Sequence, residues 1–424
     1  MKDLNKITDQ FLMSIHMHPD LTDIQKTTDV FLSEMNKGLL GEPSSLKMIP
    51  TYISVKGLPC DDRPVVAIDA GGTNLRIALV SFINGVPYVS KLEKYDMPGS
   101  RGEISSECFF DELADKVLPY TVDANIIGFC FSYPAEIFPN CDGKILCLTK
   151  EVNVKNAEGK IIGKELIDKL QKKGAKNDFK FILLNDTVAS LMGGVASLNT
   201  SDCCGLSGLI LGTGNNTCYA EIGNRIKKLK SASDMIINCE SGNFSKALRG
   251  ESDMMTDADS DNPGAYLFEK MLGGVYHGKV ITNTSVLASK EGLLSENFKQ
   301  ISPMFTTPEL DDFMRGTENR ILQMCQGDDA DVLRIIIELS FERAAKLVCA
   351  NIAALCLHSG GGKSRDLPFC VFAEGSTFYK SLLFKDKLDK YVKSYIEDEQ
   401  LRFVVFKRAE NLTLVGAAYS ALVN

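Results

Sequence analysis

Apolar residues in the first part of the chain recur at helical spacing. Between residues 4 and 38 they fall at Phe11 and Ile15 and again from Ile24 onward, and the pattern is interrupted at His18-Pro19. This spacing predicts a helical lead-in that is broken at the proline.

From Val65 the pattern changes to short runs rich in β-branched and aromatic residues. The first connection is Gly-Gly-Thr and the second is Asn84-Gly85, a strong hairpin signal. Strands are predicted at 65–69, 74–83, 86–95, 125–131 and 179–184, and helices at 106–120, 163–173 and 187–198. Alternating strands and helices are typical of a layered α/β domain.

The opening hairpin has a second copy later in the chain. The stretch VVAIDAGGTNLRIALV, which begins at Val65, aligns without a gap on SGLILGTGNNTCYAEI, which begins at Ser207. Each has an apolar run, a tip with two glycines and an asparagine, and a second apolar run, which suggests two domains built on one plan. Asp69 corresponds to Leu211, so only the first tip carries an acid. The second unit is predicted to continue through helices near 309–325 and 330–357 and a strand at 368–373.

Length and composition support this organisation. The 424 residues exceed the roughly 250 that one core usually reaches, so about two domains are expected. The net charge of −8 is spread without a basic cluster, which argues against a nucleic-acid partner. No apolar run is long enough to span a membrane. Thirteen cysteines without a CxxC pair indicate a reducing, cytoplasmic compartment, and four scattered histidines make a zinc site improbable.

The two glycine tips suggest a phosphate-binding function. Glycines at a tight strand connection leave backbone N–H groups free to converge on an anion. Asp69 would then be a natural holder of Mg²⁺, directly or through water, and Arg76 would add a positive charge for the terminal phosphate. For either tip alone, a hairpin turn without a ligand is the simpler interpretation. The presence of two matched tips favours phosphate binding.

Two other motifs imitate nucleotide and calcium loops. GGGKS at 360–364 resembles the end of a P-loop, but position 357 is leucine and a helix precedes it, which favours a helix C-terminal turn. Asp257, Asp259 and Asp261 resemble a calcium loop, but Phe268 stands where glutamate is needed. We expect a solvated acidic loop there.

Polar residues follow several apolar runs. Ser132, Asn185-Asp186 and Glu240 stand where predicted strands end, and Asn216 lies in the second tip. Ligand groups of α/β proteins occur at such strand ends, and this mixture of hydroxyl, amide and carboxylate groups suits a sugar. Taken singly, Asp186 fits a helix N-cap as well as a catalytic base.

At this point the chain resembles the hexokinase family. DAGGTNLR is similar to its first phosphate loop, GFCFSYP followed by Thr149-Lys150 to its sugar signature, and LNDTVASLMGG to the segment with its catalytic aspartate. LGTGNNTCY, NCESGNF, NPGAYLFEKMLGG and AEGSTFYK resemble further motifs, in order over residues 60 to 420. The resemblance implies an α/β, two-domain actin-like ATPase (ribonuclease H-like) fold with duplicated βββαβαβα units around a cleft. The expected small domain is 65–185 plus 411–424, and the large domain is 1–64 plus 186–410.

The resemblance also implies the roles of individual residues. Phosphate and magnesium contacts are expected at Asp69 (through water), Gly71, Gly72, Thr73, Asn74 and Arg76, and nucleotide contacts at Thr213, Gly274, Gly375 and Ser376. Hexose contacts are expected at Ser132, Thr149, Lys150, Asn185, Asp186, Asn216, Glu240 and Glu269. The chain departs from the family pattern at Leu148, Glu151-Val152, Tyr266, Val275 and 411–414, which leaves the preferred hexose and phosphate donor open.

The resulting hypothesis is an ATP-dependent hexokinase. Asp186 would accept the proton of the hexose 6-hydroxyl as it attacks the terminal phosphate of MgATP, while Lys150 and Arg76 neutralise charge. The cleft is expected to close on sugar before transfer, through hinges near 64, 185 and 410. A catalytically silent hexose sensor and an actin-like ATPase acting on proteins are the alternatives, and the chain is expected to be a monomer or homodimer.

Overall fold

The computed structural model describes residues 3–55, 62–72, 74–148, 152–176, 178–198 and 200–424. Its helices are α1 Leu4–Ser14, α2 Ile24–Leu40, α3 Ser106–Val117, α4 Ile162–Lys172, α5 Asp186–Ser197, α6 Glu251–Ala258, α7 Leu267–Leu272, α8 Gly274–Lys290, α9 Thr307–Met314, α10 Arg320–Met324, α11 Asp329–Ser359, α12 Ser376–Lys380, α13 Phe384–Tyr391 and α14 Leu412–Val423. Short 3₁₀ turns are η1 Pro19–Leu21, η2 Leu118–Val122, η3 Gly223–Arg225, η4 Ser241–Asn243 and η5 Glu296–Phe298, and η6 Val392–Glu399 is a π-helix.

The strands are β1 Ile49–Pro50, β2 Val65–Gly71, β3 Asn74–Ile83, β4 Val86–Asp96, β5 Ile104–Ser105, β6 Ile126–Phe131, β7 Ala135–Ile137, β8 Gly143–Ile145, β9 Val154–Lys155, β10 Lys180–Leu184, β11 Leu206–Leu211, β12 Asn215–Glu221, β13 Met235–Asn238, β14 Phe369–Glu374 and β15 Val404–Lys407. Five of them form one sheet in the order β10-β6-β2-β3-β4, and six form another in the order β1-β13-β12-β11-β14-β15. The predicted strands and helices of residues 65–198 are therefore confirmed, with small shifts at their ends.

One predicted helix is wrong in its extent. The helix expected near 309–325 is two helices, α9 and α10. Gly316 adopts a left-handed φ of 76° just after α9, and the side chain of Asn319 accepts hydrogen bonds from two backbone N–H groups at the start of α10. A left-handed glycine ends a helix and an asparagine cap begins one, so the periodicity alone joined two separate elements.

By internal packing the chain divides into two compact units. Unit 1 comprises Met1–Lys47, Leu209–Thr217 and Cys239–Val405, and unit 2 comprises Met48–Gly208, Cys218–Asn238 and Phe406–Asn424. The domain limits expected from the sequence, 65–185 with 411–424 and 1–64 with 186–410, remain a prediction.

Unit 2 is built on the five-stranded sheet. Strands β2 and β3 form an antiparallel hairpin, and β6 lies parallel to both β2 and β10. Alternate residues of β2 and β6, such as Ile68 and Phe129, join the core formed with α3 and α4. The opposite face of the sheet packs against α14, where a Cβ on Gly128 would lie 2.1 Å from the carbonyl oxygen of Ala417. Asp69 therefore lies on the face covered by α14.

Helices α5 and α14 cross at glycines within unit 2. A Cβ on Gly193 would lie 2.1 Å from the Leu412 carbonyl oxygen, and one on Gly416 would lie 1.8 Å from that of Ala189. Only glycine permits so close a backbone approach. The crossing fixes the first turn of α14 against α5, whose first residue is Asp186.

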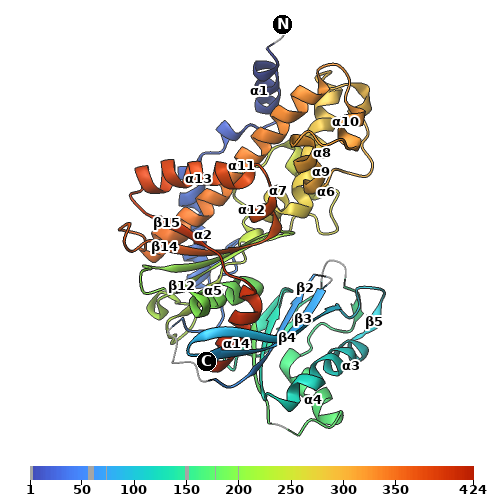
Figure 1. Cartoon of the computed structure of the whole chain (residues 1–424). Helices are drawn as coiled ribbons and strands as arrows, with labels where there is room; N and C mark the ends of the chain where they lie inside the picture. Colours follow the sequence, from blue (N-terminus) through green and yellow to red (C-terminus); the bar gives the residue numbers. More distant parts are fainter. Residues whose placement is uncertain (1–2, 56–61, 73, 149–151, 177, 199) are drawn as a thin grey trace. The chain divides into compact units, whose positions relative to one another are not determined.

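Unit 1 is mostly helical and its longest helix is α11, which packs against α2 and α13 (Figure 1). Three aromatic rings form a buried cluster, with the Phe31 and Phe244 centroids 3.8 Å apart and Phe268 at their edges. A buried ion pair joins Arg343 of α11 to Asp253 of α6, and Arg343 also donates to the Leu248 carbonyl oxygen.

His277 on α8 makes a testable contribution to acid sensitivity. It is fully buried, its Nε2 lies 2.9 Å from Ser340 Oγ, and burial together with the Arg343 charge lowers its pKa from 6.5 to about 3. Below pH 6.5 the unfolded chain therefore binds a proton at His277, whereas the folded protein does not bind it until about pH 3. The free energy of unfolding therefore decreases as the pH is lowered through this window. We expect about 2 kcal/mol of unfolding free energy to be lost between pH 7 and pH 5.

The measurement is urea unfolding at pH 7 and pH 5, with His277→Gln beside the parent chain. The variant is expected to lose much less stability over this interval. Glu34 and Glu309, whose pKa values are lowered to about 2, add acid sensitivity only below about pH 4.5, outside the interval. Equal losses in both proteins would contradict the role of His277.

Several smaller expectations have outcomes here. Gly360 is the left-handed C-cap of α11, with φ 74°, which confirms a helix-terminal turn at 360–364. Cys203 and Cys370 each take part in a disulfide, whereas ten other described cysteines are free thiols, so the expectation of reduced cysteines fails at these two positions. In the part of the chain that the structure describes, no helix combines the length and apolar character needed to cross a membrane.

Candidate functional site

In unit 2, the predicted functional residues gather where three parallel strands end. Strands β2, β6 and β10 run side by side, with Asp69 opposite Cys130 and Cys130 opposite Leu184. Ser132 follows β6 directly and donates its N–H to the Ala70 carbonyl oxygen at 3.1 Å. Asn185 and Asp186 follow β10 directly. The carboxyl ends of parallel strands are where α/β folds place ligand groups, so this edge is a candidate active site.

Asp69 and Arg76 face each other across the β2–β3 hairpin. Arg76 Nε donates to Asp69 Oδ2 at 3.0 Å, and its Nη2 makes a second, short contact with the same oxygen. Thr413 of α14 completes the group, because its hydroxyl lies 3.0 Å from Asp69 Oδ2 and 2.9 Å from Arg76 Nη2. The carboxylate is buried and 29% of the Arg76 side chain is exposed, so the ion pair can present its guanidinium to a ligand.

The start of α5 positions the proposed base. The N-cap is Asn185, whose Oδ1 accepts from Thr187 N at 3.0 Å. Asp186 is the first helical residue, and its Oδ1 accepts from Thr187 N at 2.8 Å and from the Thr187 hydroxyl at 3.3 Å. The alternative of Asp186 as the N-cap is therefore wrong. A negatively charged side chain in the first turn interacts favourably with the helix dipole.

Cys130 lies beneath this strand edge. It is completely buried, and burial, reinforced by the negative charges of Asp69 and Asp186, raises the pKa of its thiol well above the usual value. Cys130 thus stays a neutral thiol, and the effect of both charges on it reflects how close the two carboxylates come to the same point of β6.

Three of the remaining unit 2 predictions belong to the first tip. Gly71 ends β2 with Ser132 Oγ 3.7 Å from where its Cβ would be, and Gly72 has a φ of +29° that side chains rarely adopt. Asn74 begins β3 and is exposed. Thr73, Thr149 and Lys150 lie outside the described residues.

In unit 1, three residues predicted to bind hexose lie in one polar cluster. Asn216 Oδ1 accepts from Ser241 N at 3.1 Å, directly beside Glu240, which adopts a left-handed φ of 54°. Glu269 Oε2 accepts from Asn215 N at 3.0 Å, and a Cβ on Gly214 would lie 2.2 Å from that oxygen. The tip glycine is therefore needed so that the Glu269 carboxylate can approach the backbone.

The predicted nucleotide residues of unit 1 surround the second tip. Gly274 N, at the start of α8, donates to Gly212 O at 2.7 Å, and Val275 N donates to Thr213 O at 3.2 Å. Gly375, with φ 120°, lies so close to β11 that a Cβ would be 2.1 Å from the Leu211 carbonyl oxygen. Ser376 follows as the first residue of α12 and is exposed. Thr213, Gly274, Gly375 and Ser376 therefore come together.

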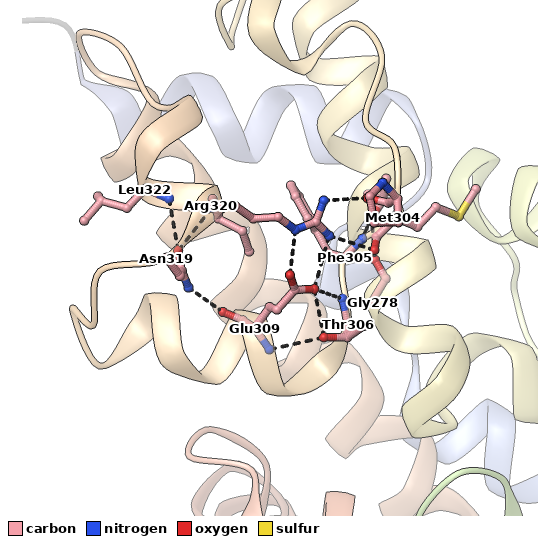
Figure 2. Close-up of polar contacts among 11 residues, drawn as sticks. Gly278, Met304, Phe305, Thr306, Glu309, Asn319, Arg320 and Leu322 are labelled. Carbon is pink, nitrogen blue, oxygen red and sulfur yellow. Dashed lines mark hydrogen bonds and ion pairs between the residues drawn. The ribbon is translucent and has the colours of Figure 1, made fainter.

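A polar network links the start of α9 to the start of α10 (Figure 2). Arg320 donates to the Met304 carbonyl oxygen at 2.9 Å and to Glu309 at 2.6 Å, and this contact lowers the pKa of Glu309 to about 2. Glu309 in turn accepts from Thr306, the N-cap of α9. The next residue, Thr307, donates its hydroxyl to Gly274 O at 2.7 Å, so the network reaches the first residue of α8.

Three residues of these clusters carry weak or no signals in the sequence. Ser241 N donates to Asn216 in the polar cluster of unit 1, Thr377 donates to Gly212 O at 3.1 Å, and Thr413 contacts Asp69. The contact between Thr413 and Asp69 could not be predicted, because the two residues are far apart along the chain and Thr413 lies in a segment that departs from the family pattern. Across the residues that the structure describes, His, Cys, Asp and Glu side chains form no group of three or more suited to a metal ion.

The comparisons with known proteins agree with this arrangement. A family model described as hexokinase matches residues 206–423, and a second one matches residues 8–196. Hexokinase-1 of Schizosaccharomyces pombe is 28% identical over 98% of this chain and 89% of its own length. Hexokinase-1 of Saccharomyces cerevisiae is 28% identical over 92% of this chain and 84% of its own length. Hexokinase-3 of Rattus norvegicus is 30% identical over 76% of this chain, which spans 37% of that protein.

Solved structures show the same fold. A Schistosoma mansoni hexokinase complexed with glucose aligns with a TM-score of 0.81 at 22% identity, over 99% of both chains. A ROK hexokinase from Thermus thermophilus aligns with a TM-score of 0.52 at 15% identity, over 84% of this chain and 97% of its own. The protein has the two-domain actin-like ATPase fold of the sugar kinases. The chain belongs to the hexokinase family, and its enzyme class is that of the phosphotransferases that use ATP to phosphorylate hexoses.

Proposed function

We propose that this chain transfers the terminal phosphate of MgATP to the 6-hydroxyl of a hexose such as glucose, with Asp186 as the general base. The observation that carries the proposal is the strand edge of unit 2, where Asp69 lies near the end of β2, Asp186 comes after β10, and Ser132 follows β6 between these two strands. One carboxylate would serve the metal and the other would serve the acceptor hydroxyl. Phosphoryl transfer requires both a group that holds the metal ion and a group that accepts the proton of the attacking hydroxyl.

The hexose would be held by two groups of side chains. Ser132, Asn185 and Asp186 come from unit 2, with Thr149 and Lys150 expected beside them. Asn216, Glu240 and Glu269 come from the polar cluster of unit 1, where Ser241 N and Asn215 N already orient two of the three. Amide and carboxylate groups fixed by backbone N–H donors suit a ligand made of hydroxyls, because each hydroxyl needs a partner at a set position.

The phosphates would be bound by backbone groups and two cations. Gly71, Gly72, Thr73 and Asn74 would contribute from the first tip, and Thr213, Gly274, Gly375 and Ser376 from the second. Arg76 and Lys150 would neutralise charge on the transferring group, a preorganised electrostatic contribution. The partly exposed guanidinium of Arg76 is compatible with this role because Asp69 and Thr413 fix its direction.

A single carboxylate fits Mg²⁺ at this site. Asp69 is the acid at the first tip, and Mg²⁺ usually keeps several waters and is held by one or two carboxylates together with substrate phosphates. Asp69 would hold the ion through water, and the bound ion would supply charge neutralisation on the phosphates. Thr413 and Arg76 would keep the Asp69 carboxylate oriented, since both donate to its Oδ2 atom.

The test is an enzyme assay over several hexoses and phosphate donors. ADP formation that requires both a hexose and Mg²⁺, with a 6-phosphorylated product identified by mass spectrometry and NMR, would support the proposal. Hexose binding without phosphate transfer would instead support the sensor. No observation favours that alternative, because sugar binding alone needs neither Asp69 nor a base at Asp186. ATP hydrolysis unaffected by any hexose would contradict the assignment.

A further inference from the structure

Lys270 is a cation in an unusual place. Its side chain is only 1% exposed, and its Nζ donates to Asp257 Oδ1 at 2.7 Å and to the Asn262 carbonyl oxygen at 2.7 Å. A buried ammonium group is costly unless it is paired and hydrogen-bonded, so these two contacts determine where the segment after α6 can lie. Lys270 is also the next residue after Glu269 on the short helix α7.

Asp257 gathers the other contacts of this segment. Its oxygens accept from Gly264 N at 3.0 and 3.2 Å, and Arg249 lies 3.5 Å away. Burial opposes the charge on Asp257, but Lys270 and the Gly264 N–H together lower its pKa below the usual value. The acidic loop expected to be merely solvated is therefore anchored through Asp257.

The contacts enclose a tight turn from Asn262 to Tyr266. Gly264 has φ +83°, and Tyr266 has φ 52°, a left-handed conformation that costs energy for a bulky residue. Ala265 N donates to Asn262 O at 3.2 Å, and Tyr266 O accepts from Lys270 N at 3.0 Å. Such strain persists only where the surroundings determine the backbone, and here the Lys270–Asp257 pair provides the surrounding constraint.

We propose that Lys270 and Asp257 are positioning residues for the hexose site. By closing the Asn262–Tyr266 turn, the pair fixes the start of α7 and therefore the place of Tyr266 and Glu269. The inference rests on the proposed function, in which Glu269 contacts the sugar. Since Glu269 is held at its far end by Asn215 N, a shift of α7 would separate its carboxylate from the second tip. Small displacements of binding groups weaken hydroxyl recognition strongly.

Helix α6 also supplies a matched control. Asp253 pairs with Arg343 of α11 at side-chain exposures of 1% and 3%, and Arg343 contacts the Leu248 carbonyl oxygen. This second pair is at least as buried as Lys270–Asp257, but it joins α6 to α11, and its further hydrogen bonds go to the backbone of Leu248 and Gly250. Removing it should therefore destabilise unit 1 without selectively changing hexose binding.

The experiment compares Asp257→Asn/Lys270→Met with Asp253→Asn/Arg343→Met and with the parent chain. We expect the first variant to raise the hexose Kd and KM about tenfold or more while KM for MgATP stays within about twofold. The second variant should lower the melting temperature and leave the ratio of the two KM values unchanged. Hexose binding is measured by titration calorimetry, because the chain contains no tryptophan to report it by fluorescence.

If the first double variant fails to fold, Lys270→Met alone tests the inference. The single variant is expected to fold because Asp257 keeps Arg249 and Gly264 N as partners. A folded Lys270→Met or double variant with unchanged hexose Kd overturns the inference. An equal rise in hexose Kd in the Asp253→Asn/Arg343→Met variant overturns it as well, since the effect would then be global. Failure of the proposed function is distinguishable, because the parent chain itself would then phosphorylate no hexose.

Discussion

Replacing Asp186 by asparagine is expected to lower kcat by about 10²- to 10⁴-fold, the range that a positioned general base contributes. Asparagine has nearly the same shape and can still accept from Thr187 N, so α5 should begin as it does in the parent. Asparagine cannot take up the proton of the 6-hydroxyl. Hexose binding should persist, so KM and calorimetric Kd for the sugar change far less than kcat.

The measurement is a coupled assay of ADP release at saturating hexose and MgATP, with calorimetry of sugar binding beside it. Asp168→Asn is the matched control, because Asp168 is an exposed carboxylate on α4 of the same unit. The control should keep the kcat of the parent. Full activity of Asp186→Asn would remove the base assignment, while loss of both binding and activity would show that Asp186 mainly holds the sugar.

The second large effect is expected for Asp69→Asn. The amide keeps the size of the side chain and can still accept from Arg76 and Thr413, but it removes the negative charge of this buried group. We expect kcat/KM for MgATP to fall by about 10²- to 10³-fold, the usual cost of one preorganised electrostatic group. The concentration of Mg²⁺ that gives half-maximal rate should rise in parallel, while the hexose Kd stays unchanged.

The rate is measured as a function of Mg²⁺ at fixed ATP. Asp96→Asn is a suitable control, since Asp96 lies at the end of β4 in the same sheet and its exposed side chain pairs with Arg101. An Asp69→Asn enzyme with the Mg²⁺ dependence of the parent would refute the metal role. In that case Asp69 would serve mainly to orient Arg76.

Most strands and helices of unit 2 could be predicted from the sequence, because apolar periodicity and turn residues act over a few neighbouring positions. Apolar runs separated by Gly-Gly-Thr and Asn84-Gly85 predict three consecutive strands joined by tight turns. The structure has β2, β3 and β4 at these positions. The polar residues at strand ends were also predictable, since Ser132 and Asn185 interrupt apolar runs that must be buried. The helix expected near 309–325 failed because spacing cannot show the left-handed glycine at 316.

Long-range partners could not be predicted in the same way. Thr413 meets Asp69 only because alternate residues of β2 face α14 and because Gly193 and Gly416 let α14 approach α5. The spacing of Asp257, Asp259 and Asp261 resembles an incomplete calcium loop and therefore predicts a solvated loop. Nothing near Asp257 in the sequence indicates that Lys270 is its partner. Pairing of buried charges depends on which helix faces meet, which only packing decides.

The sequence by itself determined the class of fold, the two glycine tips and the polar residues at the strand ends, because strand periodicity and turn chemistry act over a few residues. The tertiary structure alone decided which of these residues share an environment. It joined Asp69 to Arg76 and Thr413, made Asn185 rather than Asp186 the cap of α5, and buried Lys270 against Asp257. The physical reason is that burial turns an ordinary polar side chain into one that must find a partner, and the partner is set by packing rather than by sequence distance.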